Sequence, residues 1–124
     1  MMSKKRKLSN NNDDSDDDDD INTDSLVEAI DNHIYFYANV SQKSIFALNK
    51  LIRALNVSLL TESSKLSASN PYIYLHINSM GGDIFASLAA VDTILSSKIK
   101  IISIVEGCAA SAATLISVVA HKRQ

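Results

Sequence analysis

The sequence predicts an α/β fold, in which apolar strands alternate with amphipathic helices. Two observations carry this prediction. Runs rich in β-branched, aliphatic and aromatic residues occur at residues 33–40, 72–78 and 99–105. Segments with apolar residues at helical spacing follow each of these runs. Repeated strand–helix units favour parallel strands joined by right-handed crossovers.

The first strand–helix unit is predicted at residues 33–59. The segment HIYFYANV, at 33–40, has the composition of a strand. Ser41 is a suitable N-cap residue, and apolar residues recur at helical spacing after it: Ile45, Leu48, Leu51, Ile52, Leu55 and Leu59. A polar loop is expected at residues 63–70, and Pro71 marks its end.

Two further units complete the predicted fold. The second strand covers residues 72–78, and a helix follows from Phe85 to about Ser97. The third strand, IKIISIV at 99–105, is apolar almost throughout and is therefore expected to be buried on both faces. An Ala-rich helix is predicted at 109–120, and it would be buried if it is apolar all round.

Composition indicates one domain that follows a polar tail. The chain has 124 residues, of which 46% are hydrophobic and 21% charged, as in a soluble globular domain. Residues 1–24 contain the basic cluster Lys4-Lys5-Arg6-Lys7 and then Asn- and Asp-rich sequence, with little apolar surface to bury. We predict a disordered basic and acidic tail at 1–24 and a domain at 25–124. Because eight of the 14 acidic residues lie in that tail, the net charge of -2 says little about partners.

Several classes of protein are disfavoured. A single cysteine, Cys108, excludes an internal disulfide, and no apolar run is long enough to span a membrane. Neither metal-ligand spacing, nor a P-loop, nor a dinucleotide fingerprint is present, so we expect no metal and no cofactor. We expect an intracellular, cytoplasmic protein without membrane or nucleic-acid partners. The cluster at residues 4–7 is also compatible with nuclear import.

Glycine-containing turns follow two neighbouring predicted strands. Gly81-Gly82 follows the second strand and Gly107 the third. The carboxyl ends of parallel strands lie side by side, and glycine lets a ligand approach the main chain closely. Amide groups at a helix start are unpaired and carry the positive end of the helix dipole. The two turns are therefore predicted to form an anion-binding site.

Ser111 is a candidate nucleophile beside the second turn. Small residues on both sides, in EGCAASAA at 106–113, leave its hydroxyl accessible to a substrate carbonyl. A serine at a strand-to-helix turn, with the next amide aimed at the developing oxyanion, suits acyl transfer. Close packing of an Ala/Ser-rich helix start would produce the same spacing, so the pattern alone leaves both interpretations open.

Residues 73–124 resemble the proteolytic subunit of the Clp protease, the ClpP family. Members carry a strand ending in Ile-Asn-Ser-Pro-Gly-Gly, a helix with Asp-Thr, and then Gly-x-Ala-Ala-Ser. The corresponding segments here are Ile77-Asn78-Ser79-Met80-Gly81-Gly82, Asp92-Thr93 and Gly107-Cys108-Ala109-Ala110-Ser111. Residues 33–57 also fit the first strand and helix of the family. The resemblance implies the amino-terminal portion of a ClpP/crotonase-like spiral of β-β-α units, incomplete at its carboxyl end.

The resemblance also implies roles for particular residues. Ser111 would be the nucleophile, and the backbone N–H groups of Gly82 and Ala112 would form the oxyanion hole. Residues 83–85 would border an extended peptide substrate: Asp83, Ile84 and Phe85. Met80 departs from the family by replacing its proline, and Ala112-Ala113 replace the usual Met-Gly.

The base that would activate Ser111 is missing from the sequence. In the family the histidine and the acidic residue of the triad follow the serine, whereas this sequence ends at Gln124. His121 is ten residues further along the same predicted helix, or about 15 Å away. His76 is expected to be a packed or half-exposed strand residue, and nothing places His33 near Ser111. We therefore expect a ClpP-like serine endopeptidase chain that is inactive alone, whether as a fragment, a degenerate product or a non-catalytic subunit.

The resemblance leaves two alternatives from other functional classes. The chain could be a non-catalytic subunit of a ClpP-like ring, or a crotonase-type acyl-CoA enzyme that uses a similar pair of amides. The partners implied are an unfolded protein or peptide substrate and a homo- or hetero-oligomeric ring. An ATP-driven AAA+ unfoldase is implied as well, although the Asp-rich tail has no counterpart of the family's docking loop.

Overall fold

A computed structural model describes residues 26–66, 71–120 and 122–123. Its elements follow in the order β1 (Leu26–Ile30), β2 (His33–Tyr37), α2 (Gln42–Leu66), β3 (Tyr72–Ser79), α3 (Ile84–Ser96), β4 (Lys100–Ala109), α4 (Ala112–Val119) and β5 (Lys122–Arg123). The predicted tail at residues 1–24 and His121 lie outside the described residues. None of the described helices is both long and apolar enough to cross a membrane.

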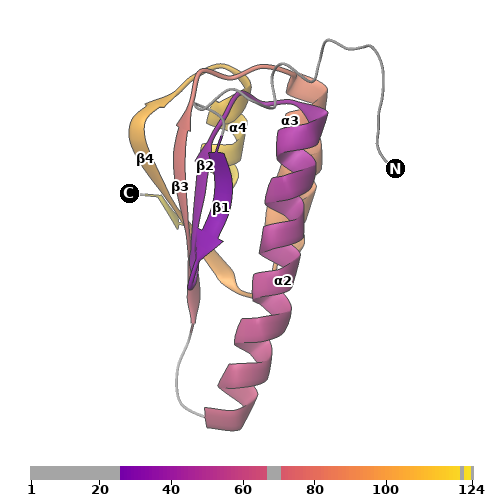
Figure 1. Ribbon diagram of the computed structural model, residues 1–124, viewed down its shortest axis with the longest axis vertical. Helices are drawn as coiled ribbons and strands as arrows, with labels where there is room; N and C mark the ends of the chain where they lie inside the picture. Colours follow the sequence, from indigo (N-terminus) through magenta and orange to yellow (C-terminus); the bar gives the residue numbers. More distant parts are fainter. Residues whose placement is uncertain (1–25, 67–70, 121, 124) are drawn as a thin grey trace, which may run out of the picture.

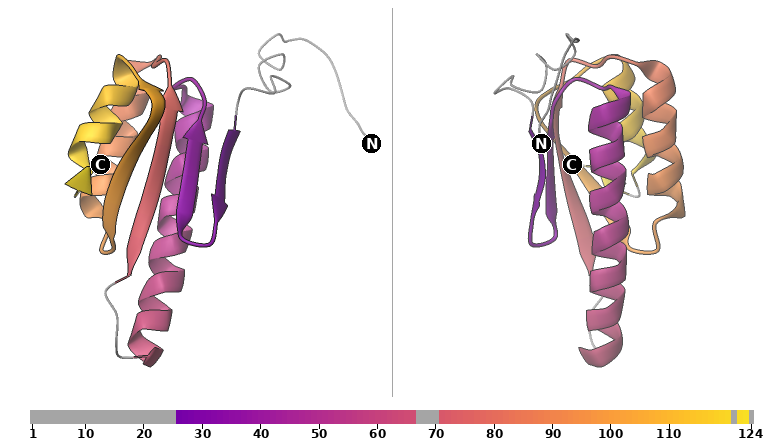
Figure 2. Two further views of the ribbon diagram at one scale, coloured as in Figure 1. Left: turned by 90° about the vertical axis from the view of Figure 1, so that its left-hand side faces the viewer. Right: turned by 45° about the vertical axis from the view of Figure 1, so that its right-hand side comes forward.

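One sheet forms the centre of the fold, and the helices cover one of its faces (Figures 1 and 2). Its strands lie in the order β1-β2-β3-β4-β5. β1 and β2 are antiparallel, whereas every later pair is parallel. The predicted α/β fold is confirmed. The first unit has the order β-β-α, and β3–α3 and β4–α4 follow it.

The core lies between the sheet and the helices. In each central strand alternate side chains point to the helices, as the period of a strand requires. The largest fully buried hydrophobic side chains come from β2, β3 and β4 and from α2, α3 and α4: Ile34, Phe36, Leu48, Ile52, Ile73, Leu75, Ile77, Ile94, Ile101 and Ile116. The opposite face of the sheet carries half-buried aromatic residues such as Tyr35 and Tyr74, and none of the described helices lies over it (Figure 2).

The hairpin of β1 and β2 was not predicted. Its two-residue turn, Asp31-Asn32, joins the paired residues Ile30 and His33. Asp31 has φ 56, and Asp and Asn are the residues that tolerate this conformation in short turns. The three strands that were predicted are parallel to one another as expected, whereas β1 was missed, although the turn signal was present in the sequence.

Helix α2 begins where the sequence predicts but ends later. The amide of Ser44 donates to Oγ of Ser41 at 3.1 Å, which confirms Ser41 as the N-cap. The helix continues to Leu66, so the loop predicted at 63–70 is wrong for residues 63–66. The polar composition of residues 63–70 had indicated a loop, but residues 63–66 continue the helix.

The predicted boundaries around Gly107 are also corrected. β4 runs through Gly107 to Ala109, and α4 starts at Ala112 rather than at residue 109. Gly107 is therefore a strand residue in an irregular part of the ladder, where Ile77 pairs with Val105 but Ser79 pairs with Ala109. Helix α4 buries only one face, formed by Ala112, Ala113, Ile116 and Ser117, whereas Val118 is exposed.

Candidate active site

The two loops that the sequence singles out meet at the carboxyl ends of β3 and β4. Ser79 pairs with Ala109, and the amide of Ala110 donates to the Ser79 carbonyl at 3.1 Å. The extra β4 residues opposite Asn78 form a bulge, which bends a strand and redirects its end. This bend carries the chain from β4 over the Gly81-Gly82 turn. The loops after β3 and β4 therefore lie against each other.

Gly81 and Gly82 each lie close to another part of the backbone: Gly81 beside Ala110 and Ser111, and Gly82 beside Val40. A Cβ atom on Gly81 would lie 2.6 Å from the Ala110 carbonyl oxygen and 2.7 Å from Cβ of Ser111. A Cβ atom on Gly82 would lie 2.2 Å from the Val40 carbonyl oxygen. Both residues also have positive φ, of 101° and 145°. Side chains are excluded at both positions, which explains why a glycine-poor chain places two glycines together here.

The N–H group of Gly82 points away from Val40, with which Gly82 forms an isolated parallel bridge. The Val40 amide donates to the Gly81 carbonyl at 2.7 Å, and the Asp83 amide donates to the Val40 carbonyl at 2.8 Å. In this parallel bridge between Val40 and Gly82, the N–H of Gly82 itself faces the other side, where the Ser111 loop lies. Within the described ranges, neither the Gly82 amide nor the Ala112 amide donates a hydrogen bond.

Ser111 occupies a strained turn. Its φ and ψ are 53° and −123°, and the Ala113 amide donates to the Ala110 carbonyl at 3.0 Å. These values are those of a type II′ turn, whose first central residue is normally glycine. A non-glycine residue held in such a conformation costs about 1–3 kcal/mol. Backbone strain at an exposed serine between a strand and a helix is typical of a nucleophile, because the turn keeps the hydroxyl outside the packed chain.

The Ser111 hydroxyl is exposed and unused. Although Ser111 precedes α4 as its N-cap residue, its side chain caps no helix amide. No hydrogen-bond partner of this hydroxyl occurs in the described part of the chain. The side chain is therefore accessible to a substrate.

The three predicted substrate-bordering residues follow Gly82 directly. Asp83 is the N-cap of α3, because its Oδ1 accepts from the amides of Phe85 at 2.9 Å and Ala86 at 3.2 Å. Ile84 and Phe85 are 51% and 80% exposed. Met80 is exposed as well, and its Sδ lies 3.7 Å from Sγ of the half-buried Cys108.

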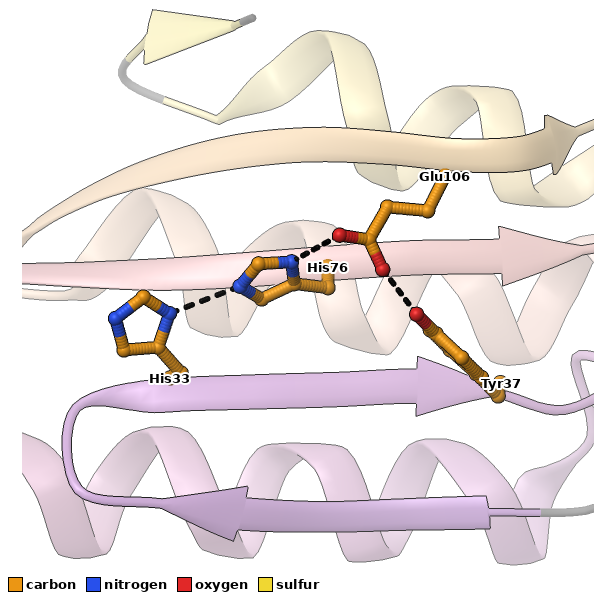
Figure 3. Close-up of polar contacts among 4 residues, drawn as sticks. All are labelled: His33, Tyr37, His76 and Glu106. Carbon is orange, nitrogen blue, oxygen red and sulfur yellow. Dashed lines mark hydrogen bonds and ion pairs between the residues drawn. The ribbon is translucent and has the colours of Figure 1, made fainter.

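A polar network on the open face of the sheet was missed in the sequence. His33 Nδ1 lies 2.9 Å from His76 Nε2, and His76 Nδ1 lies 2.7 Å from Glu106 Oε2. The Tyr37 hydroxyl donates to the other Glu106 oxygen. Figure 3 shows these four side chains in front of β2, β3 and β4, with the helices behind the sheet. Polar residues at alternate positions of three apolar strands were the available signal.

The two histidines in this network are not positioned to activate Ser111. Both ring nitrogens of His76 already have partners, and the side chain is 10% exposed. This agrees with the expectation that His76 is a packed strand residue. His76 precedes Ser79 by three positions in the extended strand β3, so the two residues are about 10 Å apart. His33 lies further along the strands, beside Tyr74.

The network changes the acidity of two of its members. The hydrogen bond from Tyr37, and then that from His76, lower the pKa of Glu106 from its ordinary value of 4.5. Conversely, the hydrogen bond to the Glu106 carboxylate raises the pKa of Tyr37 to about 12. The carboxylate is therefore favoured in its ionised form and the phenol in its neutral form.

This network should make stability depend on pH at both extremes. A carboxyl whose pKa is lowered by folding stabilises the fold above pH 4.5, and this contribution is lost as pH falls through the lower folded value. Tyrosine ionises near 10.0 when unfolded, so stability is also lost as pH rises from there to about 12. We expect the free energy of unfolding of Glu106→Gln to vary less with pH in both windows, with a small amplitude because the Glu106 side chain is 38% exposed.

Urea denaturation at pH values across these windows would measure the effect, and Tyr37→Phe should flatten the alkaline limb in the same way. Parallel pH dependences for the wild type and Glu106→Gln would contradict this assignment.

The described residues contain no group of three or more His, Cys, Asp or Glu side chains arranged to hold a metal ion. At the converging loops, the groups available for chemistry are the Ser111 hydroxyl and the main-chain N–H groups of Gly82 and Ala112. Such an arrangement stabilises the negative oxygen that develops during acyl transfer.

Comparison with known proteins identifies the family of the chain. Residues 26–124 match the family model for Clp protease. The chain belongs to the Clp protease family. No curated protein matches the sequence.

Solved structures of Clp proteases share the fold. ClpP1 from Listeria monocytogenes is 26% identical with a TM-score of 0.60, and the match covers 72% of this chain and 46% of that one. The ClpP protease catalytic domain from Plasmodium falciparum is also 26% identical, with a TM-score of 0.61, and the match covers 72% and 44% of the two chains. The present chain therefore spans less than half the length of these Clp proteases.

Proposed function

We propose that the two loops form the nucleophile and the oxyanion hole of a ClpP-like serine endopeptidase. Ser111 would attack the peptide carbonyl, and the amides of Gly82 and Ala112 would stabilise the oxyanion. The observation that carries this proposal is the strained, exposed Ser111 beside a glycine turn, since neither its hydroxyl nor the Gly82 amide has a hydrogen-bond partner among the described residues. Membership of the Clp protease family supports it.

The proton acceptor for Ser111 would come from outside the described residues. Histidine is the usual base for a serine nucleophile, and it must lie within about 3 Å of the hydroxyl. The two described histidines are held in the network with Glu106. We therefore expect this chain by itself to hydrolyse peptides far more slowly than an enzyme with a complete triad.

Assembly into a ring, with unfolded polypeptide as the substrate, belongs to the same proposal. Large exposed apolar side chains occur on both α2 and α3, including Phe46 at 63%, Val57 at 69% and Leu95 at 61%. A protein–protein contact in a ring would cover such side chains. An intracellular location would suit the free thiol of Cys108.

Covalent labelling tests the proposed site. We expect a fluorophosphonate to modify Ser111 selectively but slowly, because the oxyanion donors are present without a base. Mass spectrometry of peptides from the labelled chain would locate the adduct, and Ser111→Ala should abolish it. Modification spread over other exposed serines at equal rates, such as Ser41, would contradict the proposal.

A second assay separates the alternatives. Purified chain should release little product from a fluorogenic peptide, whereas rapid release that Ser111→Ala abolishes would show that the chain has its own base. A chain that is not labelled at all would be a non-catalytic ring subunit. Binding of an acyl-CoA would support the crotonase-type alternative.

A further inference from the structure

The hydrogen bonds that lead from the histidines to Glu106 all run in one direction. A carboxylate only accepts, so Nδ1 of His76 is the donor in its 2.7 Å contact with Glu106 Oε2. A neutral imidazole carries one N–H group, and Nε2 of His76 therefore accepts from Nδ1 of His33 at 2.9 Å. The lowered pKa of Glu106 agrees with this order, because it keeps the carboxylate ionised. The chain of donors from His33 through His76 thus ends on a negative charge.

This order determines the state of the second ring nitrogen of His33. Because Nδ1 holds the proton, Nε2 keeps its lone pair. Figure 3 shows that nitrogen on the side of the ring away from His76. Among the described residues it has no hydrogen-bond partner, and Asn49 Oδ1 is the only polar atom of a non-exposed side chain there that is buried without one. Nε2 of the half-buried His33 is therefore accessible to solvent.

Neighbouring aromatic rings hold this imidazole in a fixed orientation. The Tyr74 ring stacks on His33 with the ring centroids 4.7 Å apart and the planes at 15°. His76 is stacked in turn on Tyr35, with the centroids 4.5 Å apart and the planes at 14°. None of the described helices covers this face of the sheet (Figure 2). A small reagent can therefore approach a nitrogen whose direction is already set.

A histidine supported in this way is a better nucleophile than a free imidazole. A carboxylate at the end of such a relay fixes the tautomer and raises the basicity of the ring. When Nε2 of His33 attacks an electrophile, the ring becomes positive and its Nδ1 proton can pass to His76. The resulting imidazolium of His76 is paired with the Glu106 carboxylate. The network thus stabilises the charge that the attack creates.

We propose that His33 is a second nucleophilic site, independent of Ser111, that takes acyl groups from activated carbonyl compounds. The bond from Nε2 to the carbonyl carbon forms, and the bond from that carbon to its leaving oxygen breaks. The leaving group departs with the electron pair as an alkoxide or aryloxide. The Nδ1 proton of His33 moves to His76 and from there to solvent, so a neutral acylimidazole remains. An uncharged donor suits the site, because the charge that the network holds is the negative one of Glu106.

The rate of acylation at each histidine tests this proposal. The full chain carrying Ser111→Ala, which removes any reaction at that hydroxyl, would be treated with diethyl pyrocarbonate. At about pH 8 free imidazole is largely unprotonated, since its pKa is about 6.5. Mass spectrometry of peptides would follow the adduct at each histidine over time. We expect His33 to react faster than His76, and about tenfold faster than N-acetylhistidine under the same conditions.

Two substitutions in the network form a matched pair. Glu106→Gln keeps an oxygen that can accept from His76 but removes the negative charge, so it should slow acylation of His33 about tenfold. Tyr37→Phe removes the bond to the other carboxylate oxygen and keeps the charge, so it should not slow this reaction. A network with a purely structural role would be weakened by both substitutions.

Three results would each overturn the nucleophilic site. They are reaction of His33 no faster than that of N-acetylhistidine, an unchanged rate in Glu106→Gln, and equal slowing in the two variants. The comparison with N-acetylhistidine needs neither variant, so it decides the question even where Glu106→Gln does not fold. Fluorophosphonate labelling of Ser111 is measured separately, and the peptidase proposal therefore fails or holds independently of this one.

Discussion

Replacement of Gly82 by alanine is expected to lower the free energy of unfolding by roughly 3 kcal/mol. The new Cβ would lie 2.2 Å from the Val40 carbonyl oxygen, so the bridge between Val40 and Gly82 would have to open. The backbone at φ 145° is also unfavourable for a residue with a side chain. Because the bridge orients the Gly82 amide, labelling of Ser111 should slow about 100-fold or more, as on loss of one oxyanion donor.

Gly107→Ala is the matched control for this variant. Gly107 also has positive φ, but its added Cβ would meet only side-chain atoms of Asn78, at 3.2 Å and beyond. The Asn78 side chain is exposed and can move, so only the backbone strain remains, at about 1 kcal/mol. Urea denaturation and the rate of fluorophosphonate labelling would measure both variants. Equal effects of the two substitutions would contradict the importance of the Val40–Gly82 bridge.

Replacement of Ser111 by glycine is expected to raise the free energy of unfolding by about 1 kcal/mol. Ser111 has φ 53° and ψ −123°, which glycine adopts without the strain of about 1–3 kcal/mol that a side chain incurs. Part of this gain is offset by the larger conformational freedom of glycine in the unfolded chain. Ser111→Ala keeps the Cβ and should leave stability close to that of the wild type.

The comparison of these two variants separates strain from the loss of the hydroxyl. Both should abolish labelling, whereas only Ser111→Gly should stabilise the fold in urea denaturation. A glycine variant less stable than the alanine variant would show that the turn at Ser111 stores no strain.

The fold was largely predictable because its hydrophobic pattern is local. The helix that Ser41 caps and the buried strand at 72–78 were recognised from spacing and composition alone. Two errors have a common cause: Gly107 and the segment at 63–66 were assigned from residue preference, whereas strand pairing and packing decide such positions. The hairpin turn at Asp31-Asn32 was overlooked, although those residue types indicate a turn.

The sequence indicated which residues make up the candidate site, but it did not indicate how they are arranged. Family motifs identified Ser111, Gly82 and Ala112, and the order of the strands placed their loops at one edge of the sheet. Spacing could not reveal that Ser111 is strained or that Val40 orients the Gly82 amide, since those depend on pairing between residues distant in sequence. The same holds for the partners of His76.

The sequence by itself determined the alternation of strands and helices, the position of the glycine turn and the serine that faces it. These features depend on side-chain periodicity and on the backbone freedom of single residues, which are properties of short segments. Only the tertiary structure decided how the elements use their polar groups, as in the network of His33, His76, Glu106 and Tyr37. Hydrogen bonds require particular atoms to meet at about 3 Å, and residues far apart in the chain meet only after the sheet has set their register.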